Sequence, residues 1–207
     1  MVRPKLTVRH ERKLRRCGHG TIAGVDEAGR APLAGPVAAA AVVLDLDNVP
    51  KGLADSKVLT AEERENLIEA ILATSQVGIA TISHAEIDTI NIRQASLRAM
   101  CRALAALPCV PDLAVVDGND PPDLPCDIEM IVKGDARIPS IAAASIVAKV
   151  VRDRMMKRLA HRFPAYGFAT NVGYGTAVHL SALAAQGPCP FHRTTFAPVR
   201  GEAETGT

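Results

Sequence analysis

Residues 21–44 read TIAGVDEAGRAPLAGPVAAAAVVL, and this stretch decides the fold. Its first six residues are typical of a strand that ends in an acidic residue, Asp26. Its last nine residues, which begin at Pro36, are almost all apolar and predict a second strand. The folded body of the chain is therefore expected to begin with two strands that are close in sequence.

The rest of the chain alternates between helical and strand patterns. Thr60-Ala-Glu-Glu63 is a capping box that opens a helix with Leu67, Ile68, Ile71 and Leu72 on one face. Further helices are expected after Ser83, along an apolar stripe at 97–107, at 139–162 and at 180–183, and further strands at 77–82, 113–117 and 128–132. This order predicts an α/β fold with a mixed five-stranded sheet flanked by helices.

Composition bounds the class of protein. The 207 residues are 48% hydrophobic and 22% charged, which is typical of one globular domain with a real core. The longest apolar stretch, 33–44, is too short to span a bilayer, and no secretory signal is recognised. Five scattered cysteines without a C-x-x-C pattern argue against disulfides and zinc. We expect a cytoplasmic protein without a membrane segment.

Charge is distributed unevenly. Residues 1–16 hold seven Lys or Arg against one acid, whereas the other 191 residues hold 17 basic and 21 acidic side chains. Residues 133–162 are basic again, with eight Lys or Arg against two acids. Two basic zones around an acidic centre suit a polyanionic ligand, but a solvated basic arm has the same composition. The charge pattern leaves both interpretations open.

Acidic residues follow three of the predicted strands. Asp26 and Asp117 each end an apolar run, and Asp135 follows another. Glu27 would face the opposite side of the sheet unless the strand breaks at Ala28-Gly-Arg30. Acids at strand ends either stop turns or form an oxygen-rich site of the kind that Mg²⁺ or Mn²⁺ prefers. Spacing alone does not choose between these two.

Residues 24–36, GVDEAGRAPLAGP, resemble the signature segment of the type 2 ribonuclease H family, in its bacterial ribonuclease HII branch. The resemblance covers about 20–198 and implies a ribonuclease H-like fold with a small helical C-terminal region. The further matching segments, in order, are Asp55-Ser-Lys57, Val116-Asp-Gly118, Lys133-Gly-Asp135, Ile141-Ala-Ala-Ala-Ser-Ile-Val-Ala-Lys149, Arg152-Asp153, Gly173-Tyr-Gly-Thr176, His179 and His192-Arg193.

The resemblance implies a metal-dependent endonuclease whose catalytic and metal-binding acids are Asp26, Glu27, Asp117 and Asp135. Such an enzyme hydrolyses the RNA strand of RNA–DNA hybrids and nicks 5′ of ribonucleotides embedded in duplex DNA, as in ribonucleotide excision repair. Two Mn²⁺ or Mg²⁺ ions would promote the reaction and leave 5′-phosphate and 3′-hydroxyl ends. Asp153 is placed outside this site, because an i, i+4 ion pair with Lys149 or Lys157 explains it.

Substrate recognition is implied for a second group of residues. In similar enzymes a Gly-Arg-Gly turn and a Tyr read the junction between a ribonucleotide and the following deoxynucleotide through the 2′-hydroxyl. The corresponding residues here are Gly29, Arg30, Ala31 and Tyr174. Ala31 departs from the family pattern, and Pro32 after it favours an extended conformation that alanine accepts. Lys57 is expected to contact a phosphate.

Several alternatives remain open at this stage. The chain could be a ribonuclease H-like nuclease acting on all-DNA substrates, or a nucleic-acid-binding module without catalysis. His179 and His192 could be general acids or hydrogen-bonded structural residues, while Lys149 and Arg152 are interpreted as a solvated helix face. The expected organisation is a monomer with a basic arm at 1–19, a catalytic domain at 20–200 whose helical C-terminal part begins near 163, and a disordered tail at 201–207.

Overall fold

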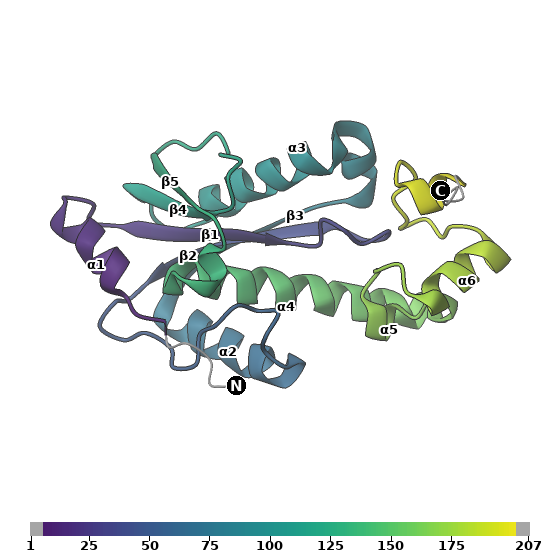
Figure 1. The fold of residues 1–207 in the computed structure, drawn as a ribbon, viewed down its shortest axis with the longest axis horizontal. Helices are drawn as coiled ribbons and strands as arrows, with labels where there is room; N and C mark the ends of the chain where they lie inside the picture. Colours follow the sequence, from purple (N-terminus) through teal and green to yellow (C-terminus); the bar gives the residue numbers. More distant parts are fainter. Residues whose placement is uncertain (1–5, 202–207) are drawn as a thin grey trace.

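One mixed sheet organises the computed structural model, which describes residues 6–201 (Figure 1). Its strands are β1 (Ile22–Ala28), β2 (Val37–Leu44), β3 (Ser75–Ile82), β4 (Leu113–Asp117) and β5 (Asp127–Ile131), in the order β3-β2-β1-β4-β5. The pairs β1–β2 and β2–β3 are antiparallel, whereas β1–β4 and β4–β5 are parallel. The predicted α/β class and the five-stranded mixed sheet are confirmed.

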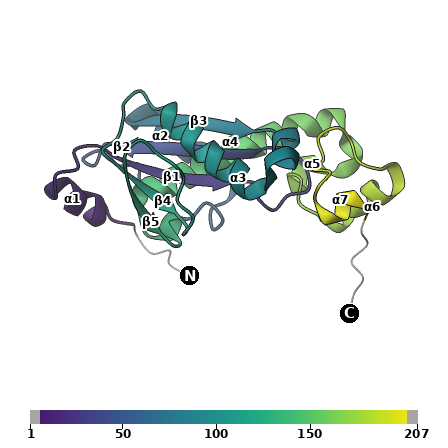
Figure 2. The same cartoon turned by 90° about the horizontal axis from the view of Figure 1, so that it is seen from above.

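Helices cover both faces of the sheet (Figures 1 and 2). Helices α2 (Ala61–Thr74) and α4 (Pro139–Arg162) share one core with β2, and α3 (His84–Ala105) shares the other core with β1 and β2. Both faces of β2 are therefore buried, which explains its almost entirely apolar sequence. The expectation that Leu72 belongs to the buried face of α2 is wrong, because its side chain is 51% exposed.

The C-terminal region forms a small helical unit at the end of α4. It contains a 3₁₀ turn, η2 (Pro164–Tyr166), and three short helices, α5 (Phe168–Asn171), α6 (Ala177–Gln186) and α7 (Ala197–Arg200). Its core includes Tyr166 and Phe168, packed with Met156 of α4 and Ala34 of the loop after β1. This confirms the small helical C-terminal region. The predicted tail falls, apart from Gly201, outside the described residues.

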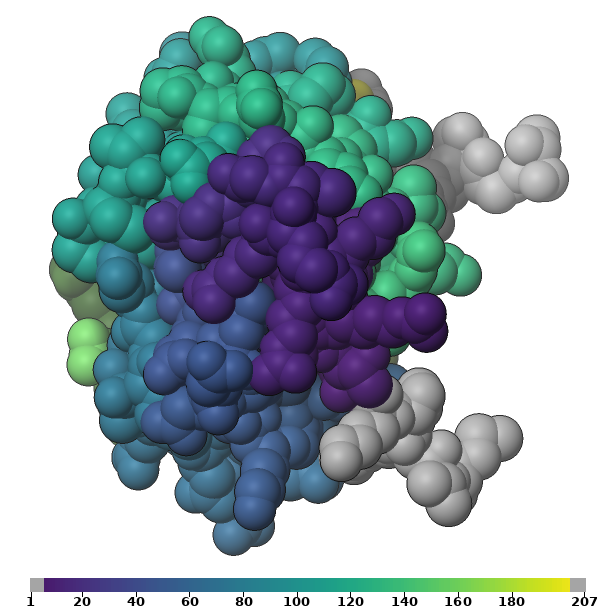
Figure 3. Space-filling view, turned by 90° about the vertical axis from the view of Figure 1, so that its left-hand side faces the viewer, coloured from purple at the N-terminus to yellow at the C-terminus, as the bar shows by residue number. Residues whose placement is uncertain are grey.

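A helix in the basic N-terminal segment was not expected from the sequence. Helix α1 (Arg9–Arg16) lies against the start of α4, and its atoms are purple in Figure 3. Its Glu11 is only 1% exposed and accepts hydrogen bonds from the backbone N–H and the hydroxyl of Ser140, at 3.2 and 3.1 Å. The cationic side chains of α1 are exposed; these are Arg9, Arg12, Lys13, Arg15 and Arg16. The acid thus docks a basic helix on the body.

Replacing Glu11 by alanine should lower the free energy of unfolding by about 1–3 kcal/mol, because two buried donors at the start of α4 lose their acceptor. The variant Glu11→Gln keeps an acceptor oxygen and should retain most of the stability. Urea denaturation measures the difference. The exposed Glu69 of α2 supplies the control, since Glu69→Ala should change stability by less than about 0.5 kcal/mol. Equal stability of Glu11→Ala and the wild type would show that the docking contributes nothing.

Within residues 6–201, no helix is both long and apolar enough to cross a membrane.

Candidate active site

Parallel pairing of β1 and β4 brings two of the predicted acids together. Val25 lies opposite Val116, so Asp26 and Asp117 occupy neighbouring positions at the same end of the two strands. Asp117 Oδ1 accepts a hydrogen bond of 2.7 Å from the backbone N–H of Gly134, which begins the 3₁₀ turn η1 (Gly134–Ala136). Asp135 is the next residue of that turn. The three acids therefore come from β1, β4 and the segment after β5, and converge on one edge.

Glu27 reaches the same edge from the other face of the sheet. The strand break expected at this point does not occur, because β1 remains paired with β2 through Ala28. Glu27 instead lines a cavity of about 70 Å³ on the side of α3, where Asp117, as the last residue of β4, also lines the wall. Arg30 Nη1 donates to Glu27 Oε1 at 3.4 Å. Asp117 thus lies near both Asp26 and Glu27, and its charge raises the pKa of each.

Burial, together with neighbouring negative charge, raises the pKa of three of these carboxyls. Burial raises the pKa of Asp26 well above its usual value, and the charges of Glu27 and Asp117 raise it further. Burial also raises the pKa of Glu27, although the Arg30 charge opposes it. The pKa of Asp117 is raised by burial and by the charge of Asp135. A bound cation would favour the charged form of these acids and lower their pKa values again.

Lys57 supplies one cation to this edge. Its Nζ donates to Asp135 Oδ2 at 3.1 Å, and Asp135 is itself only 4% exposed. Burial lowers the pKa of Lys57, but the hydrogen bond to Asp135 and nearby acidic charges outweigh it and raise the pKa overall. In the sequence Lys57 was expected to contact a phosphate; in the structure its ammonium group contacts an acid of the site.

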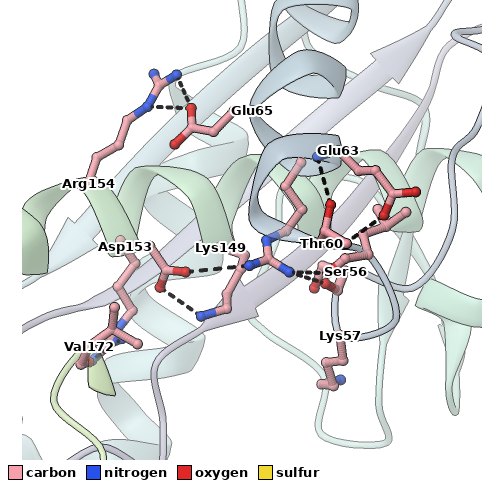
Figure 4. A network of polar contacts seen from close by, with 12 residues as sticks. Ser56, Lys57, Thr60, Glu63, Glu65, Lys149, Asp153, Arg154 and Val172 are labelled. Atoms are coloured by element: carbon pink, nitrogen blue, oxygen red, sulfur yellow. Dashed lines mark hydrogen bonds and ion pairs between the residues drawn. The ribbon is translucent and has the colours of Figure 1, made fainter. Parts of the chain in front are cut away.

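The loop that carries Lys57 is held from behind by a polar network (Figure 4). Arg64 Nη1 donates to the carbonyl oxygens of Ser56 and Leu59, at 2.8 and 2.6 Å. Arg64 in turn lies 4.0 Å from Asp153, which accepts a hydrogen bond of 2.7 Å from Lys149. The predicted Lys149–Asp153 pair is confirmed, and it anchors the loop through Arg64.

Two serines beside Asp26 were missed by the sequence analysis. Ser145 of α4 lies close enough to Asp26 for its hydroxyl to lower the pKa of that carboxyl, and its Oγ lies 2.9 Å from the hydroxyl of Ser56. Both serines are buried. The signal was present, since both lie in segments that match the family, but helix periodicity alone gives no reason to single out a small polar residue.

The two segments expected to recognise the substrate lie side by side. The backbone N–H of Leu33, two residues after Ala31, donates to the carbonyl oxygen of Gly173 at 2.8 Å. Tyr174 follows directly, and its side chain is 43% exposed. Gly29 has φ +97°, whereas Ala31 is not among the residues with positive φ, so the alanine is accommodated without backbone strain. The turn 29–31 thus lies beside the Tyr174 segment, and its Arg30 contacts Glu27 of the acidic edge.

Arg152 corrects the sequence interpretation. It was expected on a solvated face of α4 with Lys149, but it is 1% exposed and donates to the carbonyl oxygens of Pro36, Val172 and Ala34, at 2.9, 2.9 and 3.2 Å. A signal was available, since Ala148 and Met156, one turn away on either side, are buried on the same stripe. Arg152 links the loop after β1 to the segment before Tyr174.

His179 and His192 are buried and hydrogen-bonded to each other, with their Nε2 atoms 2.9 Å apart. They lie in the C-terminal core, and burial lowers the pKa of both, that of His192 to about 4. A neutral ring is a very weak acid, and these two rings are enclosed in the protein core with their nitrogens hydrogen-bonded inside it. The geometry therefore favours the structural interpretation over the general acid.

Comparison with known proteins gives consistent matches. The family model described as Ribonuclease HII matches residues 23–199. A ribonuclease HII of Azorhizobium caulinodans is 54% identical over 197 residues, which cover 95% of this chain and 76% of the relative, and one of Rhizobium meliloti is 58% identical over 191 residues, covering 92% and 88%. Among solved structures, the ribonuclease H2 of Pyrococcus horikoshii superimposes with a TM-score of 0.75 at 28% identity, covering 87% of this chain and 95% of that one.

Proposed function

The chain belongs to the ribonuclease HII family and is a type 2 ribonuclease H, and from this premise we propose that it nicks duplex DNA on the 5′ side of an embedded ribonucleotide. On RNA–DNA hybrids it hydrolyses the RNA strand, and in both cases it leaves 5′-phosphate and 3′-hydroxyl ends. One observation carries the proposal: the hydrogen bond between Leu33 and Gly173 joins the turn 29–31 to the Tyr174 loop beside the acidic edge.

The metal-binding residues in this proposal are Asp26, Glu27, Asp117 and Asp135. Their chemistry fits a hard divalent cation, Mn²⁺ or Mg²⁺, because all four offer carboxylate oxygens and three have pKa values raised in its absence. No three acidic, His or Cys side chains among residues 6–201 are already arranged as a metal-binding group. The proposal therefore requires these side chains to rotate towards the cation, and Lys57 to leave Asp135 when it binds.

Two bound cations would supply Lewis acids for the attacking water and the departing 3′ oxygen. The residues of the chain prepare the site for them. Ser145 orients the carboxylate of Asp26, and the backbone N–H of Gly134 fixes that of Asp117. Lys57, once released from Asp135, is exposed and free to pair with a phosphate of the substrate.

Selection of the cut site rests on the 2′-hydroxyl, the group that distinguishes a ribonucleotide from its neighbours in DNA. Backbone groups of Gly29, Arg30 and Ala31 would contact it, while the exposed ring of Tyr174 would pack against the following deoxyribose. The arrangement favours this activity over cleavage of all-DNA substrates, in which no 2′-hydroxyl is present.

The test is a cleavage assay on duplex DNA with one ribonucleotide, a uniform RNA–DNA hybrid and an all-DNA duplex, each with Mg²⁺, Mn²⁺ or chelator. A metal-dependent nick 5′ of the single ribonucleotide is expected. Cleavage of the hybrid alone would support nuclease activity but contradict the proposed recognition of the junction. Absence of cleavage on every substrate would favour a binding module without catalysis.

Replacing Ala31 by glycine should relieve crowding by the methyl group beside the sugar. The KM for the duplex with one ribonucleotide is expected to fall about two- to threefold while kcat stays unchanged. Steady-state kinetics measure the effect. The control is Ala185→Gly, since Ala185 is an exposed alanine of α6. If Ala31→Gly alters neither the rate nor the preference for the single ribonucleotide, the crowding argument is wrong.

A further inference from the structure

Arg193 is a fully buried cation bound to the backbone of the substrate-facing loop. Its side chain is 0% exposed. Nη1 donates to the carbonyl oxygen of Arg30 at 2.7 Å and Nη2 to that of Gly29 at 2.6 Å. Nε donates to Gly35 at 3.0 Å, and Nη2 also contacts Pro36 at 3.2 Å. One planar group therefore fixes four carbonyl oxygens on both sides of Ala31.

The neighbouring pair, His179 and His192, is hydrogen-bonded to the second recognition segment, which carries Tyr174. His192 Nδ1 lies 2.9 Å from the backbone nitrogen of Cys189 and 3.2 Å from its carbonyl oxygen, so it can accept from the first or donate to the second. The carbonyl oxygen of Tyr174 can only accept, so His179 Nδ1 must carry the proton of its neutral ring, and the proton of His192 must lie on Nε2. That proton is donated to His179 Nε2 at 2.9 Å. His179 Nδ1 then donates to the carbonyl oxygen of Tyr174 at 2.8 Å. Only one arrangement of protons on the two neutral rings satisfies every hydrogen bond in this series.

Backbone hydrogen bonds join the segment that Arg193 binds to the segment that the histidine pair binds. The N–H of Arg193 donates to the carbonyl oxygen of Leu33 at 2.8 Å, and the N–H of Leu33 donates to that of Gly173 at 2.8 Å. We propose that Arg193, His192 and His179 form one positioning unit, which holds the turn 29–31 and Tyr174 at the separation needed to recognise the junction between a ribonucleotide and the following deoxynucleotide. This inference rests on the proposed function, because it assigns the junction to these two segments.

The contacts of the unit indicate that it positions the two recognition segments and does not only fill the core of the C-terminal region. An apolar core would stabilise the C-terminal region without the need to satisfy a guanidinium and two imidazoles in a buried place. Three of the carbonyl oxygens that the unit binds, those of Gly29, Arg30 and Tyr174, belong to the two recognition segments. Tyr166 packs edge-on against both histidine rings, but its hydroxyl donates to Gly187 at 2.7 Å, away from those segments.

The test compares kcat/KM on two substrates, the duplex with one ribonucleotide and the uniform hybrid. In His179→Leu the first value should fall about tenfold, the effect of one lost buried hydrogen bond, while the second changes less than about twofold. His179→Asn places an amide N–H near the position of Nδ1 and should recover most of the loss. Arg193→Lys keeps the positive charge but loses the planar guanidinium that binds several carbonyl oxygens at once. It should change the ratio of the two kcat/KM values in the same direction as His179→Leu. A partly unfolded sample lowers both values equally, so the ratio reports positioning alone.

The control is Tyr166→Phe, which should lower the melting temperature and leave the ratio unchanged. An equal loss on both substrates in His179→Leu, or no recovery in His179→Asn, would overturn the positioning unit. The variant Tyr174→Ala separates the two proposals. If it leaves the ratio unchanged, the proposed recognition by Tyr174 is wrong and the unit falls with it. If it changes the ratio while His179→Leu does not, the unit alone is wrong. Added to Tyr174→Ala, His179→Leu should change the ratio no further.

Discussion

Replacement of Asp26 by asparagine is expected to abolish cleavage, with kcat reduced at least about 10³-fold on every substrate. The amide keeps the size and the hydrogen bond to the backbone N–H of Glu27, but it removes the negative charge that a divalent cation requires. Substrate affinity in chelator should be unchanged or tighter, because a negative charge opposite the phosphates is lost. Cleavage assays and fluorescence anisotropy measure the two effects.

The same substitution should stabilise the metal-free protein, by about 1 kcal/mol or more at neutral pH, since it removes a buried like charge. The raised pKa values of Asp26, Glu27 and Asp117 have a related consequence. Above the usual carboxyl pKa, the folded protein still holds protons that the unfolded chain has released, so its stability falls as pH rises through the raised values. Asp26→Asn should weaken that dependence, and Mg²⁺ or Mn²⁺ should oppose it in the wild type only.

Thermal unfolding in chelator and in metal, over a range of pH, tests this expectation. The matched control is Asp123→Asn, an exposed aspartate for which neither cleavage nor stability should change. Wild-type cleavage by Asp26→Asn would remove Asp26 from the reaction, and a less stable variant would show that the buried charge is compensated by groups of the protein itself.

Gly24→Ala is expected to cost more than about 3 kcal/mol of stability, beyond the usual range for an added methyl group in a core. A Cβ at position 24 would lie 2.1 Å from the carbonyl carbon of Ser140 and 2.4 Å from the backbone nitrogen of Ile141. Backbone atoms cannot rotate away, so α4 must move off β1. Because α4 carries Ser145, the fraction that still folds should also cleave more slowly.

Chemical denaturation together with activity per folded molecule measures both effects. Gly20→Ala is the control, since its Cβ would meet only a side-chain oxygen of Asp112, at 3.3 Å. A loss in Gly24→Ala no larger than that in Gly20→Ala would mean that the sheet and α4 adjust to the methyl group, and that their close approach is not needed for the fold.

Most of the fold could be predicted from local patterns. The capping box at Thr60 and the Pro at the start of α4 mark helix boundaries through contacts within a few residues, and the structure has both. The helix at 9–16 could not be predicted in this way, because it depends on Glu11 binding Ser140, 129 residues away. Its own sequence, rich in like charges, gives little reason for a stable helix.

The acids of the candidate site could be located from the sequence, whereas the residues that support them could not. Asp26 and Asp117 end apolar runs, and parallel pairing then places them together. The sequence patterns gave Arg193 no role and placed Arg152 on a solvated helix face. Arginines are seldom fully buried, and periodicity does not reveal which carbonyl oxygens lack a hydrogen-bond donor. Such partners are determined by the tertiary arrangement of loops distant in sequence.

The distance along the chain between Arg193 and Gly29, 164 residues, has a consequence for biosynthesis. Synthesis proceeds from the N-terminus, so the segment with Asp26 and Glu27 leaves the ribosome well before Arg193. The turn 29–31 remains without its buried donor until Arg193 has been translated. A nascent chain that stops before Arg193 would therefore carry Asp26 and Glu27 without the group that binds the carbonyl oxygens of Gly29 and Arg30.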